Sequence, residues 1–295
     1  MALTNRGLAA YARAQAQANS PYWYGCTGQI ADMDGKLYEQ KKKQYPDQYP
    51  PRKWTEDSFR CQFGKKVMDC IGLTKAYINS TSKPDALGIV PEPLAASVYS
   101  QKYDWSANGT FEHAKEKGNI TTMPEIEGLQ VWKNNHVGVY IGNGLVSEEA
   151  GHAKGCIISK LSDKQWVAWF KHPAITYYTD IEYFVLRLYV LVLGREPDDG
   201  GFRFWVDGLR KKMITPTQVA FSFLTSDEFV SRNLSDDEFL YVLYRALFDR
   251  EPDAAGKEYW LGFLSIDDDE HTRDVVIVCF LSSEEWKRLV EASYT

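Results

Sequence analysis

The C-terminal part of the chain repeats a helical pattern of apolar positions. Leu186, Tyr189, Val190 and Leu193 lie at i, i+3, i+4 and i+7. This spacing places the four side chains on one face of an α-helix. The same spacing recurs within 240–247. Both stripes predict amphipathic helices that pack on a shared core.

Signals for the start and end of a helix frame each stripe. The segments Thr179–Glu182 and Ser235–Glu238 have the form of capping boxes, which satisfy free backbone amides in the first helical turn. Pro197 and Pro252 follow the stripes and cannot continue a helix. Thr215–Gln218 predicts the start of another helix, with proline at the favoured first position.

These signals belong to an internal repeat. The segment 184–198 resembles 239–253, and 223–229 resembles 280–286. The offset is 55 residues at first and 57 residues later, so the second copy carries a short insertion. A repeat of this length indicates one supersecondary unit used twice. We therefore expect an all-α domain over 178–295, with repeats at about 183–233 and 238–290.

Residues 1–177 have a different pattern, with Gly-rich turns, short alternating strands and irregular stretches. Val137, Val139 and Ile141 alternate along the chain, which predicts a strand with one buried face. Gly142–Gly144 predicts a tight hairpin turn, after which a second strand returns. An apolar face over 71–78 predicts a helix. The fold class expected for this region is α+β.

Composition and charge narrow the choice of partners. The chain has 44% hydrophobic and 25% charged residues, as in a globular protein. Its net charge of −6 argues against nucleic acid or an anionic membrane as the main partner, because both favour clustered Lys and Arg. The longest apolar run, Val275–Leu281, is too short to span a bilayer. Arg6 and Arg13 interrupt any signal-peptide core, so we expect synthesis in the cytoplasm without a visible signal peptide.

The five cysteines are odd in number and contain no C-x-x-C pair, which argues against a disulfide scaffold or a structural zinc site. No H-E-x-x-H motif is present, so no metal ligands are assigned. Cys70 stands at the entrance of a predicted helix, where free amides and the helix dipole would lower the pKa of a thiol. It is a candidate nucleophile, although a cysteine considered alone is more often a small buried side chain.

His136 and Glu148 supply the other groups that thiol catalysis requires. His136 begins the first predicted strand, and Glu148 lies on the returning strand, where its carboxylate would orient the imidazole. His152 is the alternative third residue, and Glu149 points to the opposite face of the strand. The remaining histidines have no catalytic surroundings and are interpreted as structural: His113, His172 and His271.

Three motifs resemble the NlpC-type family of peptidoglycan cysteine peptidases: Tyr24–Cys26, Asp69–Leu73 and His136–Gly144. The resemblance implies a papain-like fold for 1–177, hydrolysis of an amide bond in bacterial peptidoglycan, and no cofactor. Endolysins of phages of Gram-positive gut bacteria are more similar still. That likeness lies in four segments: Leu3–Gly7, Lys42–Pro46, Phe63–Lys65 and Gly151–Gly155.

The resemblance assigns a role to each site residue. Cys70 matches the nucleophile, His136 the general base and Glu148 the residue that orients the imidazole. Tyr24 matches a tyrosine that lines the site and supports the oxyanion. Asp69 and His152 are the remaining candidates for contact with the substrate.

The sequence departs from the family pattern at two places. Ile71 replaces a serine that, with the preceding Asp, helps some members to bind the amino end of a stem peptide, so the cleaved bond stays open. Cys26 replaces a glycine, and roughly forty residues are inserted before Cys70. This insertion is expected either to line the substrate groove or to pack apart from it.

The helical repeat resembles tandem GREPD-type domains, which have no assigned function and occur beside enzymatic or secreted regions of bacterial and phage proteins. Its position beside a lytic domain suggests cell-wall binding. A structural or oligomerising role, giving a homo-oligomer, is nearly as well favoured. The acidic turns at Glu196–Asp199 and Glu251–Asp253 lack the spacing of a dedicated calcium loop, so turns that cap helices are favoured.

Two other functions stay open on the sequence. One is a catalytically inert wall-binding protein, and the other is a thiol acyltransferase that acts on a substrate outside the wall. The intact Cys70 and His136 favour an enzyme, because an inert descendant is expected to lose one of them. A glycosidase requires two placed carboxylates, and nothing in the sequence singles out such a pair.

Overall fold

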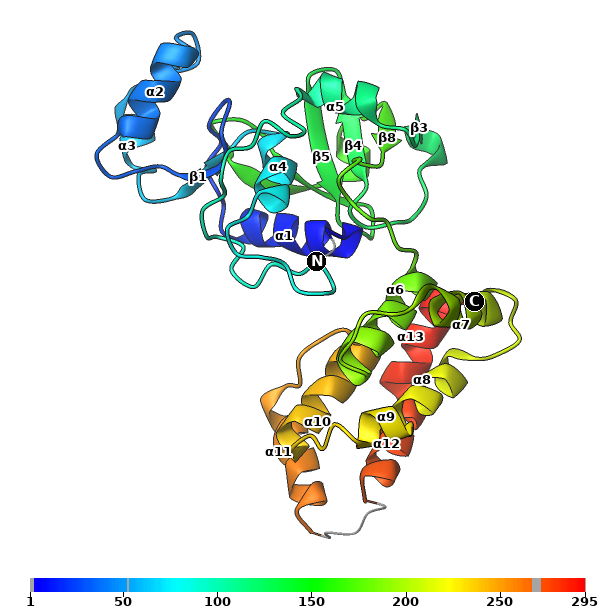
Figure 1. The fold of residues 1–295 in the computed structure, drawn as a ribbon. Coiled ribbons are helices and arrows are strands. Elements are labelled where there is room, and N and C mark those ends of the chain that lie inside the picture. The colour runs from blue at the N-terminus through cyan, green and yellow to red at the C-terminus, as the bar shows by residue number, and fades with distance from the viewer. Residues whose placement is uncertain (1–2, 52, 267–271, 295) are drawn as a thin grey trace. The chain divides into compact units, whose positions relative to one another are not determined.

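A computed structural model describes residues 3–51, 53–266 and 272–294 of the chain. The structure is mixed α/β at the N-terminal end and helical at the C-terminal end (Figure 1). It divides into two compact units, Met1–Tyr177 and Tyr178–Thr295. Among the described residues, none of the helices combines the length and the apolar character needed to cross a membrane.

The first unit is built on a six-stranded antiparallel sheet in the order β3-β8-β4-β5-β6-β7. A separate two-stranded sheet joins β1 (Thr27–Ile30) to β2 (Lys66–Met68). The strands of the large sheet are β3 (Lys117–Asn119), β4 (Gln130–Lys133), β5 (His136–Tyr140), β6 (Leu145–Glu149), β7 (Cys156–Lys160) and β8 (Ala168–Phe170).

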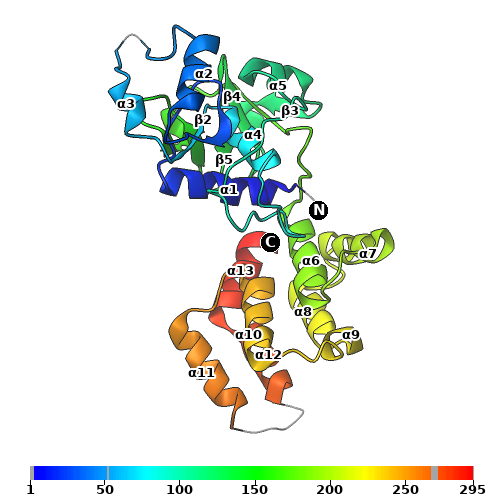
Figure 2. The same cartoon turned by 60° about the vertical axis from the view of Figure 1, so that its left-hand side comes forward.

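Helices α1 (Asn5–Gln17) and α4 (Gly72–Ile78) pack on one face of this sheet (Figure 2). Leu8 of α1, Leu73 of α4 and Val139 of β5 meet in the core between them. A second apolar cluster covers the other face, so β5 is buried on both sides rather than on the one side expected. Three short helices complete the large-sheet region: α5 (Ala107–His113), η1 (Ile120–Thr122) and η2 (Leu161–Asp163).

The predicted hairpin between β5 and β6 is confirmed. Gly142, Asn143 and Gly144 all have positive φ, at 86°, 53° and 68°. These are the conformations that favour Gly and Asn in tight turns. The Ile141 amide donates to the Leu145 carbonyl at 2.9 Å, which closes the turn.

The inserted segment folds around an aromatic cluster of its own. It contains α2 (Lys36–Gln44) and α3 (Asp57–Arg60), which lie beside each other in Figure 1. The Trp23 ring is fully buried and meets the rings of Tyr38, Tyr49 and Phe59 at centroid distances of 6.0, 5.9 and 5.4 Å. Such edge-on contacts favour a rigid cluster.

The second unit contains helices only, among its described residues. The three predicted N-terminal caps are present, with complete capping boxes at Thr179, Thr215 and Ser235. The helices are α6 (Asp180–Arg187), η3 (Leu188–Val192), α7 (Asp199–Arg210), α8 (Pro216–Leu224), α9 (Asp227–Val230), α10 (Asp236–Leu243), η4 (Tyr244–Phe248), α11 (Ala254–Leu264), α12 (Thr272–Ser282) and α13 (Glu284–Tyr294). Both η3 and η4 are π-helical, at equivalent places in the two copies.

The Arg-Glu-Pro-Asp turn of each repeat ties three elements together. In the first copy, the Arg195 guanidinium lies over the Tyr189 ring at 5.1 Å and donates to both oxygens of Glu228, at 2.5 and 3.2 Å. Asp198 caps α7 by accepting from the Gly201 amide at 2.8 Å. The second copy has the same contacts through Arg250, Tyr244, Glu285 and Asp253.

Asp198 and Asp253 of these turns therefore cap helices, which is the interpretation that the sequence favoured over a calcium site. Both aspartates accept from a backbone amide and lie within 4 Å of the arginine of the same turn. Over the described residues, no group of three or more His, Cys, Asp or Glu is arranged to hold a metal ion.

Candidate active site

A cavity of about 960 Å³ opens in the first unit. Its wall combines the segment before β1, one face of α2, the start of α4 and the loop before α5. Cys70, Asp69, Tyr24 and Tyr22 all line it. The insertion contributes Lys41 and its neighbours on α2, so it both packs on an aromatic cluster and lines the groove.

Cys70 lies two residues before the first residue of α4 and is partly exposed. Burial raises the pKa of the Cys70 thiol to about 12, and the negative charge of Asp69 adds to this effect. The backbone amides of Val137 and Ile71 lower the pKa, but by less. The thiol is therefore neutral near pH 7.

This raised pKa is opposite to the lowered one expected from a helix N-terminus. Burial is the largest reason, and the free amides of α4 offset it only in part. The amide of Gly72, the first helical residue, donates to the Asp69 carboxylate at 2.7 Å and not to the thiol. The helix is also short, with seven residues, so its dipole is small.

His136 and Glu148 form a buried pair across the hairpin. Nε2 of His136 lies 2.7 Å from Oε2 of Glu148, whose side chain is fully buried. Ser159 donates to the other oxygen at 2.5 Å, and Nζ of Lys164 lies 3.2 Å from it. Burial alone would raise the pKa of Glu148, but these three partners outweigh it and hold the pKa at about 2.

The pairing fixes the tautomer of the neutral imidazole. An ionised carboxylate only accepts hydrogen bonds, so the proton of neutral His136 sits on Nε2. Nδ1 then keeps its lone pair, and it has no hydrogen-bond partner among the described residues. This is the nitrogen available to take a proton from a nucleophile.

The ring of His136 is held in position by its neighbours. It stacks on Trp166 with a centroid distance of 5.5 Å and an interplanar angle of 12°. Gly138 makes this arrangement possible, because a Cβ there would lie 2.5 Å from Val146 and 3.2 Å from the Trp166 ring. The glycine of the His-Val-Gly motif therefore leaves room for the side chains packed around the His136 ring.

Cys70 and His136 come from elements that meet at Val137. The Val137 amide interacts with the Cys70 thiol, and Val137 directly follows His136 on β5. Within the part of the chain that the structure describes, no hydrogen bond joins the thiol to the imidazole. Such bonds are often long in ligand-free enzymes and shorten when the substrate binds.

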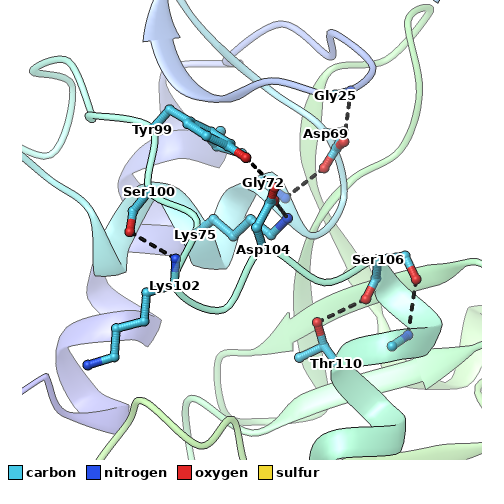
Figure 3. A network of polar contacts seen from close by, with 12 residues as sticks. Gly25, Asp69, Gly72, Lys75, Tyr99, Ser100, Lys102, Asp104, Ser106 and Thr110 are labelled. Carbon is cyan, nitrogen blue, oxygen red and sulfur yellow. Dashed lines mark hydrogen bonds and ion pairs between the residues drawn. The ribbon is translucent and has the colours of Figure 1, made fainter.

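Asp69 acts as a clamp rather than as a free group for substrate. Its Oδ2 accepts from the Gly25 amide at 2.9 Å, and its Oδ1 accepts from the Gly72 amide at 2.7 Å (Figure 3). The carboxylate therefore ties the aromatic segment before β1 to the start of α4. Burial raises its pKa, while the two amides counteract that rise.

The structure brings Tyr22 into the site, a residue that sequence reasoning missed. Trp23 points into the aromatic core, so Tyr22 and Tyr24 on either side of it face the cavity. Burial raises the pKa of Tyr22, and the charges of Asp69 and Cys70 contribute. Tyr24 is exposed and packs edge-on against Tyr45 at 5.1 Å. The signal available in the sequence was this alternation of three aromatic residues.

His152 lies elsewhere, among residues of the insertion. Its ring stacks on Phe59 at 4.2 Å and meets Trp54 at 4.7 Å, and Nε2 lies 3.1 Å from Oγ of Ser58. It is absent from the lining of the cavity described above. His136 and Glu148 are absent from this lining too, so contact between His152 and the substrate stays a prediction. Burial lowers the pKa of His152.

Two of the other histidines contact aromatic rings, His113 at the surface and His172 in the interior. His113 stacks on Trp105 at 4.1 Å, and His172 is buried against Tyr103 at 5.5 Å. Burial lowers the pKa of His172 to about 4. His271 lies outside the described residues.

Glu149, next to the site, should make stability depend on pH. Its carboxyl is fully buried beside Cys156, neither oxygen accepts from an N–H or O–H group among the described residues, and burial raises its pKa well above 4.5. The folded protein thus keeps a proton that the unfolded chain loses above about pH 4.5, so stability falls as pH rises.

We expect Glu149→Gln to remove this dependence. The variant should melt several degrees above the parent protein at pH 8, at roughly 2–4 °C per kcal/mol, and close to it at pH 5. Thermal denaturation at the two pH values measures the difference. A parent protein that is as stable at pH 8 as at pH 5 would contradict a protonated Glu149.

Comparison with known proteins bears on the second unit. No curated protein matches the chain. Residues 174–232 and 220–290 match a family model described as a domain of unknown function (DUF4214). The two matches follow the two copies of the repeat, and the helical unit is thus similar to domains for which no function is recorded.

Proposed function

We propose that the first unit is an NlpC-type peptidoglycan hydrolase with a papain-like fold, similar to phage endolysins. It would act on the bacterial cell wall and cleave an amide bond of the stem peptide. The observation that carries this proposal is the buried Glu148 at 2.7 Å from His136, whose neighbour Asn135 lines the same cavity as Cys70. A histidine oriented by a carboxylate beside a partly exposed cysteine is the arrangement of thiol acyl transfer.

The reaction starts from a neutral thiol. Nδ1 of His136 takes the proton of Cys70, and the sulfur attacks the carbonyl carbon of the amide. The tetrahedral intermediate collapses to a thioester as the C–N bond breaks, and the leaving amine takes the proton from His136. Water, deprotonated by His136, then attacks the thioester and releases the acid and the free thiol. No cofactor takes part in these steps.

The lining of the cavity suits a peptide. Lys41, Gln40 and Gln44 project from α2 into it, with Tyr45 and Tyr99 nearby. The amide groups of the two glutamines can pair with peptide carbonyls, while tyrosine rings cover apolar side chains. The ammonium of Lys41 donates to the Gly25 carbonyl. Lys75 contributes no free charge, because its Nζ lies 2.6 Å from Oδ1 of Asp104 (Figure 3).

Tyr22 is assigned to the oxyanion in place of Tyr24. Tyr22 is half-buried and lines the same cavity as Cys70, and its neutral form is retained because its pKa is raised. We expect Tyr22→Phe to lower kcat about 10²-fold, the usual effect of losing one oxyanion donor, with a smaller change in KM. Tyr24→Phe is the matched control and should keep most of the activity. Equal losses in both variants, measured by steady-state hydrolysis, would contradict the reassignment.

The type of bond tests the proposed function directly. Purified Gram-positive peptidoglycan is incubated with the protein, and new amino groups and new reducing sugars are titrated separately. Amide hydrolysis releases amines without reducing ends. Reducing ends without amines would indicate a glycosidase. No product from several wall types would favour the inert binding protein or the acyltransferase acting outside the wall.

A further inference from the structure

The internal repeat offers two versions of one helix to compare, α7 and α11. At the offset of 55 residues, most exposed positions of the two helices have diverged. Three pairs of equivalent positions stay apolar because they pack in or against the core. They are Trp205 with Trp260, Val206 with Leu261, and Leu209 with Leu264. One exposed position keeps its aromatic character, as Phe204 in the first copy and Tyr259 in the second. Each is 65% exposed, so core packing does not explain the retention.

The two exposed rings are presented in the same way. Phe204 stands edge-on to Trp205, with a centroid distance of 5.0 Å and an angle of 76°. Tyr259 stands edge-on to Trp260 at 5.0 Å and 81°. Each tryptophan rests in turn on a phenylalanine of the core, Phe223 at 5.4 Å or Phe280 at 5.3 Å. Each copy therefore holds an exposed aromatic face on a rigid support.

The surroundings indicate the chemistry of the ligand. The residue before the exposed ring is Arg203 in one copy and Glu258 in the other, so the adjacent charge reverses. A charged group common to both ligand sites would be attracted at one and repelled at the other. The exchange of Phe for Tyr shows that a hydroxyl is not required either. What the copies share is an uncharged aromatic face.

We propose that Phe204 and Tyr259 are two stacking sites for an uncharged repeating glycan, the sugar backbone of bacterial wall polymers. The C–H face of a pyranose ring matches an exposed aromatic face, and a repeating chain supplies one sugar to each copy. Two weak sites on one molecule give an avidity of about 10²–10⁴ over a single site when both can be engaged. The second unit then holds the protein on the wall, independently of any reaction at Cys70.

The test measures binding of the full chain. The Cys70→Ala background prevents cleavage, and the probe is particles of chitin, an insoluble and uncharged polymer of N-acetylglucosamine. Phe204→Ala and Tyr259→Ala should each weaken co-sedimentation at least about 10-fold, and the double variant should lose it. Phe204→Tyr should retain binding. Val230→Ala is the matched control, because Val230 is 69% exposed and its counterpart is Lys287.

Several outcomes would overturn the proposal. Undiminished binding of the double variant would exclude the two rings, and a large loss in Val230→Ala would show a non-specific apolar effect. Binding to intact walls but not to chitin would indicate recognition of the peptide or of anionic wall polymers. Since the readout is binding by a cysteine-free site, failure of the hydrolase proposal would leave this result unchanged.

Discussion

Replacing Cys70 with alanine should abolish the release of wall fragments and leave the fold in place. Removing the nucleophile of an acyl-transfer site lowers kcat by about 10⁴–10⁶-fold. The side chain lost is small and partly exposed, so the cost in stability should be about 1 kcal/mol or less. Turbidity loss of purified walls measures activity, and circular dichroism with a melting curve measures the fold.

Cys61 provides the matched control for this variant. Its thiol is exposed and donates to the Ser58 carbonyl at 3.3 Å. Cys61→Ala should therefore retain full activity and the same sensitivity to thiol-blocking reagents. Substantial lysis by a folded Cys70→Ala protein would refute the assignment of the nucleophile.

Replacing Glu148 with glutamine should lower kcat/KM by about 10²–10⁴-fold through the tautomer of His136. The amide group of glutamine can donate to Nε2, which moves the imidazole proton to Nδ1. That nitrogen can then no longer accept the proton of Cys70, whose pKa is raised to about 12 in the free protein. Steady-state hydrolysis over a range of pH values tests this effect.

Ser159→Ala is the appropriate control, because Ser159 donates to the other oxygen of Glu148 and leaves the contact with His136 intact. Its activity should stay within about 10-fold of the parent protein, the scale of one neutral hydrogen bond. Comparable losses in both variants would show that the carboxylate supports the structure without setting the tautomer.

The pair of Glu148 and His136 should also make the protein less stable in acid. The pKa of Glu148 is about 2 in the folded protein against 4.5 for an ordinary glutamate. Its contribution to stability is thus present above about pH 4.5 and is lost as the pH falls towards 2. The pKa difference corresponds to about 3 kcal/mol.

Local periodicity was sufficient to predict the hairpin and the contact between His136 and Glu148 across it. The alternation around Val137 and the Gly-Asn-Gly turn place His136 and Glu148 on adjacent strands, and the structure gives the contact at 2.7 Å. The caps of the helical repeat were predictable for a similar reason. In each case the interacting residues are close in sequence.

Contacts between distant segments could not be predicted in this way. The carboxylate of Asp69 accepts a hydrogen bond from the amide of Gly25, which is 44 residues away in the sequence. His152 packs on Phe59 because the insertion folds back on the loop after β6. The pKa of Cys70 depends on burial, which a helix-start motif does not reveal. In the repeats, the pairing of Arg195 with Glu228 could not be predicted, because the two residues are 33 positions apart in the sequence.

Mass spectrometry of fragments released from Gram-positive peptidoglycan, by the parent protein and by Cys70→Ala in parallel, tests the central claim most directly. The account predicts new peptide or amide ends that only the parent protein makes, and their masses identify the bond. The same fragments from the Cys70→Ala protein, or none from a folded and reduced parent protein on several wall types, would contradict it.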